Sequence, residues 1–236
     1  MFKINCFLLL AILLLPLTLR AQYVTYNSSD TVALRELPYS GAKVIETYGN
    51  FTFVPSIDDE CGFGGDPDDS LFIKYTNDCK VCGDSCNKWM FTGLGYINND
   101  NLLYYRENKE LEYTEFGDSL IVFQLGKDTI IKVTFIPFDS AEYIIDREHR
   151  TIDGIYAIGG TLYPHYEAKE AEIIIGGNNT DKIDFTRMYD PTVSVYKGKY
   201  GEFYFKIQVG DGSESFSIVW VIVDGKFGDS ASRYAC

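Results

Sequence analysis

Short apolar runs alternate with polar positions along most of the chain. Val, Ile, Tyr, Phe and Thr dominate these runs, and Gly, Asp and Asn separate them. An alternation with a period of two predicts strands. We expect them at residues 32–37, 43–48, 51–54, 71–75, 88–92, 95–97, 120–125, 130–136, 154–162, 172–175, 182–185, 193–196, 203–209 and 216–223. The pattern therefore predicts an all-β fold.

The C-terminal half carries the clearest of these signals. Residues 216–223 are apolar on both faces, because Ile218, Trp220 and Ile222 alternate with valines, and this predicts a central strand. Gly-Asp-Gly at 210–212 predicts a hairpin between residues 203–209 and 216–223. Gly176-Gly177 and Asp224-Gly225 predict two more turns.

Helix signals are scarce. Asp139 and Glu142 have the spacing of a capping box, which predicts one short helix over residues 143–149. Strands without long helices between them lack the crossovers of parallel sheets, so α/β enzyme folds are disfavoured.

The first residues have the pattern of an export signal. Lys3 precedes an apolar run at residues 7–17, which Pro16 interrupts, and small residues follow near Ala21. The run is shorter than the ~20 residues that a membrane span needs, although an uncleaved anchor is the alternative. We expect a signal peptide at residues 1–22, no membrane span in the mature chain, and a periplasmic or extracellular location.

Composition narrows the classes of partner. The hydrophobic share of 46% and aromatic share of 15% exclude a largely disordered chain. A net charge of −13 disfavours nucleic acid and anionic lipid as partners, because both attract basic surfaces. The charged stretch at residues 106–112 has no strand alternation, so we place a boundary there. We expect one unit at residues 23–105 and a β-rich, sandwich-like unit at residues 112–236.

An acidic insertion at residues 58–86 interrupts the first unit. It contains four cysteines: Cys61, Cys79, Cys82 and Cys86. In an exported protein they indicate disulfides, whose pairing the sequence does not fix. A zinc site with four thiolates is the alternative. Cys236 is left over, either free or paired between chains. The acidic side chains indicate a solvated loop, with calcium binding as the alternative.

The ends of the first unit carry a family pattern. The first end has Ala33-Leu34-Arg35, Pro38 and Lys43-Val44-Ile45, and the second has Trp89, Gly95-Tyr96-Ile97 and Leu102. Together they resemble the two ends of a bacterial SH3-like domain. The chain departs from that pattern in its insertion and in Lys88, where the family often has Gly. The resemblance implies a small β-barrel that attaches to cell-wall peptides or glycans.

The resemblance also implies where a ligand would bind. The aromatic residues to test are Trp89, Tyr96, Tyr39 and Tyr48. The alternative is that these rings pack the barrel core and rim, since aromatic side chains dominate small cores.

These observations predict an exported, non-catalytic protein of the cell envelope that binds wall peptide or glycan without a cofactor or metal. One alternative is a structural or protein-interaction module with a protein partner. A hydrolase using paired carboxylates is another. Glu60-Cys61-Gly62 resembles the nucleophile motif of papain-like cell-wall endopeptidases but lacks its Ser, so we do not expect an enzyme.

Overall fold

The computed structural model describes residues 23–54, 74, 77–80, 82–149, 151–156, 164–210 and 215–234. Strands dominate these residues and the helical segments are short, so the fold is all-β, as the alternation predicts. The expected signal peptide, Cys61, Cys236 and most of the acidic insertion lie outside the described residues. Within the described ranges, no helix has the length and apolar character to cross a membrane.

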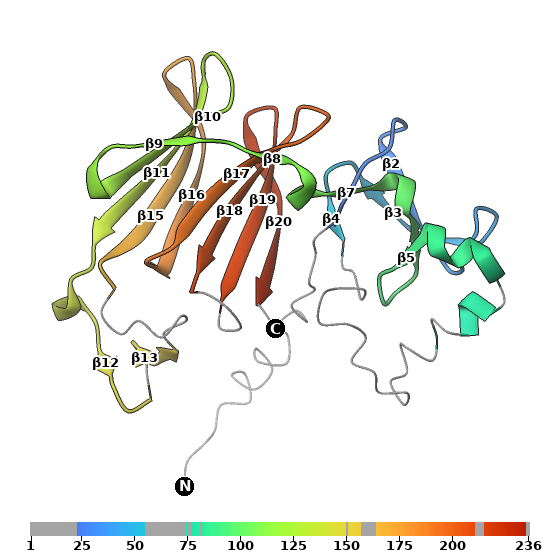
Figure 1. Cartoon of the computed structure of the whole chain (residues 1–236), viewed down its shortest axis with the longest axis horizontal. Helices are drawn as coiled ribbons and strands as arrows, with labels where there is room; N and C mark the ends of the chain where they lie inside the picture. Colours follow the sequence, from blue (N-terminus) through green and yellow to red (C-terminus); the bar gives the residue numbers. More distant parts are fainter. Residues whose placement is uncertain are drawn as a thin grey trace, which may run out of the picture.

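Two antiparallel five-stranded sheets form the larger part of the molecule (Figure 1). Sheet one has the order β16-β15-β11-β10-β9, and sheet two has the order β20-β19-β18-β17-β8. Sheet one consists of β9 (Tyr113–Glu115), β10 (Leu120–Gln124), β11 (Thr129–Pro137), β15 (Tyr166–Ile175) and β16 (Asn178–Tyr189). Sheet two consists of β8 (Lys109–Glu110), β17 (Thr192–Lys197), β18 (Phe203–Val209), β19 (Phe216–Val223) and β20 (Lys226–Tyr234).

Two of the predicted turns join neighbouring strands. Gly176 and Gly177 connect β15 to β16 with φ values of 57° and 83°, and Asp224 and Gly225 connect β19 to β20 with φ values of 51° and 70°. Two successive residues with positive φ suit the twist of antiparallel strands, and this is why such hairpins favour Gly and Asp. The turn chemistry therefore sets these two hairpins locally.

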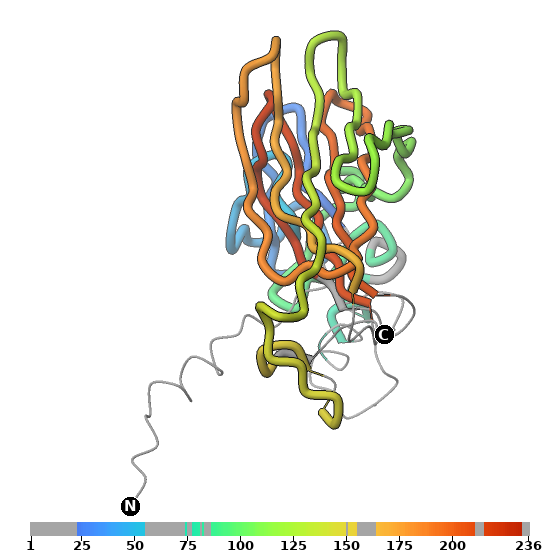
Figure 2. Tube along the Cα trace, turned by 90° about the vertical axis from the view of Figure 1, so that its left-hand side faces the viewer, coloured from blue at the N-terminus to red at the C-terminus, as the bar shows by residue number. Residues whose placement is uncertain are grey.

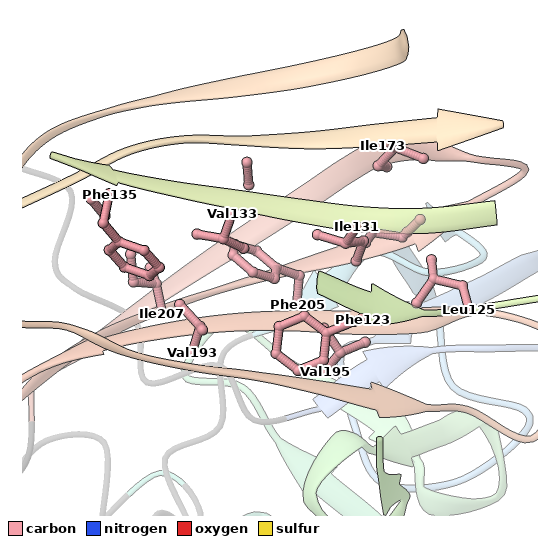
Figure 3. Close-up of a cluster of buried hydrophobic side chains, with 13 residues drawn as sticks. Phe123, Leu125, Ile131, Val133, Phe135, Ile173, Val193, Val195, Phe205 and Ile207 are labelled. Atoms are coloured by element: carbon pink, nitrogen blue, oxygen red, sulfur yellow. The ribbon is translucent and has the colours of Figure 1, made fainter. Parts of the chain in front are cut away.

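The inner faces of the two sheets pack against each other as a sandwich. Because successive side chains in a strand point to opposite faces, every second residue enters this core. Figure 3 shows side chains from both sheets pointing toward one another. The fully buried residues include Phe123, Ile131, Val133, Ile173, Val195 and Phe205.

A smaller N-terminal unit contains two further sheets. One has the order β4-β1-β7 and the other β3-β2-β6-β5. Its strands are β1 (Tyr23–Thr25), β2 (Thr31–Arg35), β3 (Val44–Gly49), β4 (Phe53–Val54), β5 (Trp89–Phe91), β6 (Tyr96–Asn98) and β7 (Leu102–Tyr104). Val32, Leu34 and Ile97 of one sheet and Val54 of the other share a core, so the two sheets enclose a common interior. Gly95 allows β2 and β6 to approach, since a Cβ there would lie 2.6 Å from the Arg35 carbonyl oxygen.

Sheet two is covered on both faces. Its inner face packs on sheet one, and its outer face packs on the N-terminal unit, which lies beside β20 (Figure 1). Val219 and Val221 of β19 and Tyr204 of β18 meet Val24 and Phe53 in this second core. The two apolar faces of β19 thus have two different covers, and the prediction of a central strand is confirmed.

A small fifth sheet lies at one end of the sandwich (Figures 1 and 2). It consists of β12 (Ile145–Asp146), β13 (Thr151–Ile152) and β14 (Ile155–Tyr156). The helix predicted over residues 143–149 is wrong: the Asp139 side chain accepts a hydrogen bond from the Ala141 N–H, but only one 3₁₀ turn follows, at Ser140–Glu142. Ile145 then pairs with Ile152, so strand pairing replaces helix extension.

The remaining helical segments are short. They are η1 (Gly83–Lys88), η2 (Asn99–Asn101), η3 (Tyr105–Glu107) and η4 (Gly117–Ser119), with further helical residues at 74, 77–80 and 82. Lys74 falls within the strand predicted at residues 71–75 and is helical instead; the other residues of that prediction lie outside the described ranges.

Candidate functional site: an aromatic hollow in the N-terminal unit

The four aromatic residues singled out from the sequence occupy different environments. Trp89 on β5 is 8% exposed, and Tyr96 on β6 is fully buried. Tyr39 is 44% exposed, in the loop between β2 and β3. Tyr48 on β3 is half-buried and donates a hydrogen bond to Glu46 (3.3 Å). Burial and the Glu46 carboxylate raise the pKa of Tyr48 to about 12.

The C-terminal part of the insertion covers the rings of β5 and β6. Phe91 and Tyr96 stack with their centroids 4.9 Å apart. The Lys74 ammonium lies 5.8 Å and 5.6 Å from the centroids of these two rings, in the range of a cation–π contact. The Tyr96 hydroxyl donates to Asp78 Oδ2 (2.9 Å), and Asp78 also pairs with Lys74. These contacts place Lys74 and Asp78 against the rings of β5 and β6, where Tyr96 is buried.

A disulfide closes this segment. Cys79 is bonded to Cys86, and their Cα atoms are 5.4 Å apart. An eight-residue helix would separate the two ends by about 10 Å, so the chain must turn back, and η1 provides this turn. The cross-link confirms a disulfide in the insertion. Cys82 has a free thiol. Cys61 lies outside the described residues, so the pairing of Cys61 stays a prediction.

The disulfide borders a hollow of about 350 Å³. We call it the aromatic hollow, and it is lined by Tyr23, Cys86, Asn87, Trp89, Met90, Asn99, Leu102, Tyr104 and Glu107. Its walls come from β1, β5 and β7 and from the 3₁₀ segments around them. Tyr23 lies directly opposite Tyr104 in the β1–β7 pair, with the ring centroids 5.4 Å apart. Pairing of β1 with β7, the first and last strands of the N-terminal unit, therefore creates one wall of the hollow.

The rim of this hollow is polar. Asn87, Asn99 and Glu107 are exposed, and the Asn99 side-chain amide donates to the Asn87 carbonyl oxygen (3.1 Å). Aromatic faces beside amide and carboxylate groups suit a ligand that has flat apolar faces and several hydrogen-bonding groups. Its volume is within the usual range for small-molecule sites.

Of the four aromatic residues predicted from the sequence, only Trp89 lines this hollow, and Cys86 of the predicted disulfides lines it too. Tyr96, Tyr39 and Tyr48 are not among its lining residues. Tyr23, Tyr104 and Glu107 were missed because they converge only through the β1–β7 pairing. The signal that could have identified them is a tyrosine in each of the two paired strands, Tyr23 in β1 and Tyr104 in β7. Both strands are only three residues long, which is too short for a clear strand pattern.

Two buried carboxylates in the sandwich are fully engaged in hydrogen bonds. Glu167 accepts from the Tyr143 hydroxyl (2.6 Å) and from the Arg187 backbone N–H (2.7 Å). Its hydrogen bond raises the pKa of Tyr143. Glu202 accepts from the Tyr204 hydroxyl (2.9 Å) and from the Tyr200 backbone N–H (2.8 Å). These contacts give both carboxylates a structural role.

Both histidines lie on the surface. The side chains of His149 and His165 are 70% and 88% exposed, and each ring is close to one carboxylate. The His149 backbone N–H and ring hydrogen-bond to Asp146 and lower the pKa of its carboxyl group. Within the described part of the chain, no group of three or more His, Cys, Asp or Glu residues has the arrangement of a metal site.

Comparison with known proteins finds no matching family model, no similar curated protein and no solved structure that matches.

Proposed function

We propose that this protein is exported and binds the cell envelope without catalysing a reaction. In this proposal the aromatic hollow holds a peptide or glycan part of the cell wall. The observation that carries it is the position of Trp89: a residue of the SH3-like sequence pattern lines a hollow together with Tyr23 and Tyr104. The leader pattern at residues 1–22 supports the location.

The architecture of the N-terminal unit supports an SH3-like module. Its strands are short, its two sheets share one core, and β1 pairs with both β4 and β7. A small enclosed β-unit of this kind suits attachment, because rigid strands hold the lining side chains in place.

The chemistry of the hollow fits the proposed ligands. Sugar rings and peptide planes both present flat faces that pack on aromatic side chains. Hydroxyl and amide groups on such ligands match the side chains of Asn87, Asn99 and Glu107. The disulfide at Cys86 fixes one wall, which lowers the entropy lost when a ligand is bound.

Co-sedimentation of the purified protein with isolated wall sacculi tests this function. We expect saturable binding by the wild type. Tyr104→Leu keeps apolar volume but removes an aromatic face, and it should weaken binding by about 2- to 10-fold. Glu107→Gln should weaken binding if the carboxylate accepts a ligand hydrogen bond. Glu112→Gln is the matched control, since Glu112 is also exposed but does not line the hollow.

Thermal unfolding of each variant must first show that the fold is retained. Absence of wild-type binding to sacculi would refute the proposal. Equal binding by Tyr104→Leu and wild type would move the site away from the hollow. Recovery of one protein partner from envelope extracts, without wall binding, would favour a protein-interaction role. Turnover of wall fragments would favour a hydrolase.

A further inference from the structure

The largest of the hollows we describe lies in the sandwich, not in the N-terminal unit. It has a volume of about 580 Å³, and we call it the sandwich cavity. It is lined by Glu115, Gly117, Asp118, Ser119, Leu120, Ile121, Phe135, Pro137, His165 and Tyr166. Apart from His165, which directly precedes β15, these residues belong to β9, β10, β11, β15 and η4, at the end of the molecule opposite the N-terminal unit (Figure 1).

One side of the cavity is apolar. Phe135 is almost fully buried and meets the half-buried Tyr166 ring edge-on, with centroids 5.3 Å apart. Ile121, which packs on the sandwich core, and Pro137 extend this wall. The wall is therefore an accessible extension of the sandwich core, and it suits a ligand with an apolar chain.

The rim of the cavity is acidic. Glu115 and Asp118 are exposed, and in the described part of the chain neither side chain has a hydrogen bond or ion pair. Glu115 and Asp118 line the cavity together with Tyr166. Burial raises the pKa of Tyr166, and the carboxylates of Asp190, Glu115 and Asp118 raise it further. Among the lining residues, His165 is the one side chain that could become positive, and its ring lies 3.5 Å from Asp190.

We propose that the sandwich cavity binds a small organic cation, a primary ammonium group on an apolar chain. The ammonium group would lie between Glu115 and Asp118 near the face of Tyr166, and the chain would pack on Phe135 and Ile121. Carboxylates and an aromatic ring both attract an ammonium ion. An anionic ligand is repelled by the same rim. This inference is independent of the proposed wall binding.

The test is a titration of the purified full chain with hexylamine, hexan-1-ol and hexanoate at neutral pH, followed by amide chemical shifts. The three probes share one apolar chain and differ in charge. We expect hexylammonium to bind at least 5-fold more tightly than hexan-1-ol, and hexanoate to bind most weakly. Shifts should concentrate on residues 115–121 and 165–166.

Two surface variants test the role of the rim. Glu115→Gln and Asp118→Asn should each weaken hexylammonium binding by up to about 5-fold, the range for one exposed charge pair. Neither should change the affinity for hexan-1-ol. Asp128→Asn, an exposed aspartate in the turn between β10 and β11 that does not line the cavity, is the matched control and should have no effect.

Three results would overturn the proposal. One is equal affinity for the amine and the alcohol, which would mean that the rim does not recognise charge. Another is saturable binding whose shifts map away from the cavity. The third is absence of a shift at the cavity with any of the probes. Because wall sedimentation does not involve these carboxylates, a failure here leaves the wall-binding result unaffected.

Discussion

Replacing Gly198 by alanine tests how tightly the turn between β17 and β18 is built around a buried carboxylate. Glu202 is only 1% exposed and accepts hydrogen bonds from the Tyr204 hydroxyl and the Tyr200 backbone N–H. A Cβ on Gly198 would lie 2.0 Å from Glu202 Oε1 and 2.1 Å from Cδ. Real Cβ atoms do not approach this closely, so the alanine variant must displace the carboxylate.

The magnitude follows from the contacts that are displaced. A hydrogen bond to a charged group contributes about 1.5–3 kcal/mol. The variant loses one or both hydrogen bonds to Glu202. It gains ~0.4–1 kcal/mol of stability because Ala restricts the unfolded chain more than Gly does, so the net effect is a loss of stability. We expect the free energy of unfolding to fall by about 1–5 kcal/mol.

Urea unfolding followed by tryptophan fluorescence measures this change. Gly126→Ala is the matched control, because Gly126 also lies between two paired strands and its nearest neighbour would be Thr129 Cβ at 4.0 Å. Its free energy of unfolding should not fall, and the unfolded-chain effect alone should raise it by about 0.4–1 kcal/mol.

A double-mutant cycle decides whether the carboxylate is the cause. In a Glu202→Ala background the alanine at position 198 has no carboxylate to displace, so it should no longer destabilise the protein, and only the unfolded-chain gain of about 0.4–1 kcal/mol should remain. If Gly198→Ala destabilises the protein equally with and without Glu202, or not at all, the reasoning is refuted.

Two further predictions use the same unfolding assay. Burial, and then the Glu202 carboxylate, raise the pKa of Tyr204 above its ordinary value, so the unfolded chain ionises first. The stability contributed by this tyrosine should be constant below about pH 10 and fall above it by up to about 1.4 kcal/mol per pH unit. If the free energy of unfolding of Tyr204→Phe fell equally steeply above pH 10, this prediction would be contradicted. The Cys79→Ser/Cys86→Ser double variant opens an eight-residue loop and should lower the free energy of unfolding by about 2.5 kcal/mol, whereas Cys82→Ser should change it little. Equal stability of the wild type and the double variant would show that the cross-link is dispensable.

Where apolar alternation is long and regular, the sequence predicts the fold closely. The strands at residues 203–209 and 216–223 form with the predicted bounds, because their side chains supply the sandwich core on one face and the second core on the other. By contrast, β20 was missed: Lys226–Tyr234 is rich in small and polar residues, and pairing with β19 makes it a strand.

Local signals failed where distant contacts decide the structure. The capping box at Asp139 closes its first turn, but Asp153 then accepts a hydrogen bond from the Ile144 N–H and draws the chain into a strand pair. The same limit applies to the aromatic hollow. The SH3-like sequence pattern singles out Trp89. Tyr23 and Tyr104 come together from opposite ends of the N-terminal unit, and no local sequence pattern encodes that contact.

The second core also constrains the order in which the chain can fold. Val24 and Phe53 are among the first described residues to be synthesised, yet they pack against Val219 and Val221, which are among the last. The N-terminal unit therefore cannot complete its burial while the chain is still growing. Contacts between residues so far apart in sequence slow folding, and the apolar surface stays open until β19 arrives. A nascent chain of this protein should therefore depend on a chaperone that covers apolar surface, or on fast completion of synthesis. A chain made of independent domains would depend on these less.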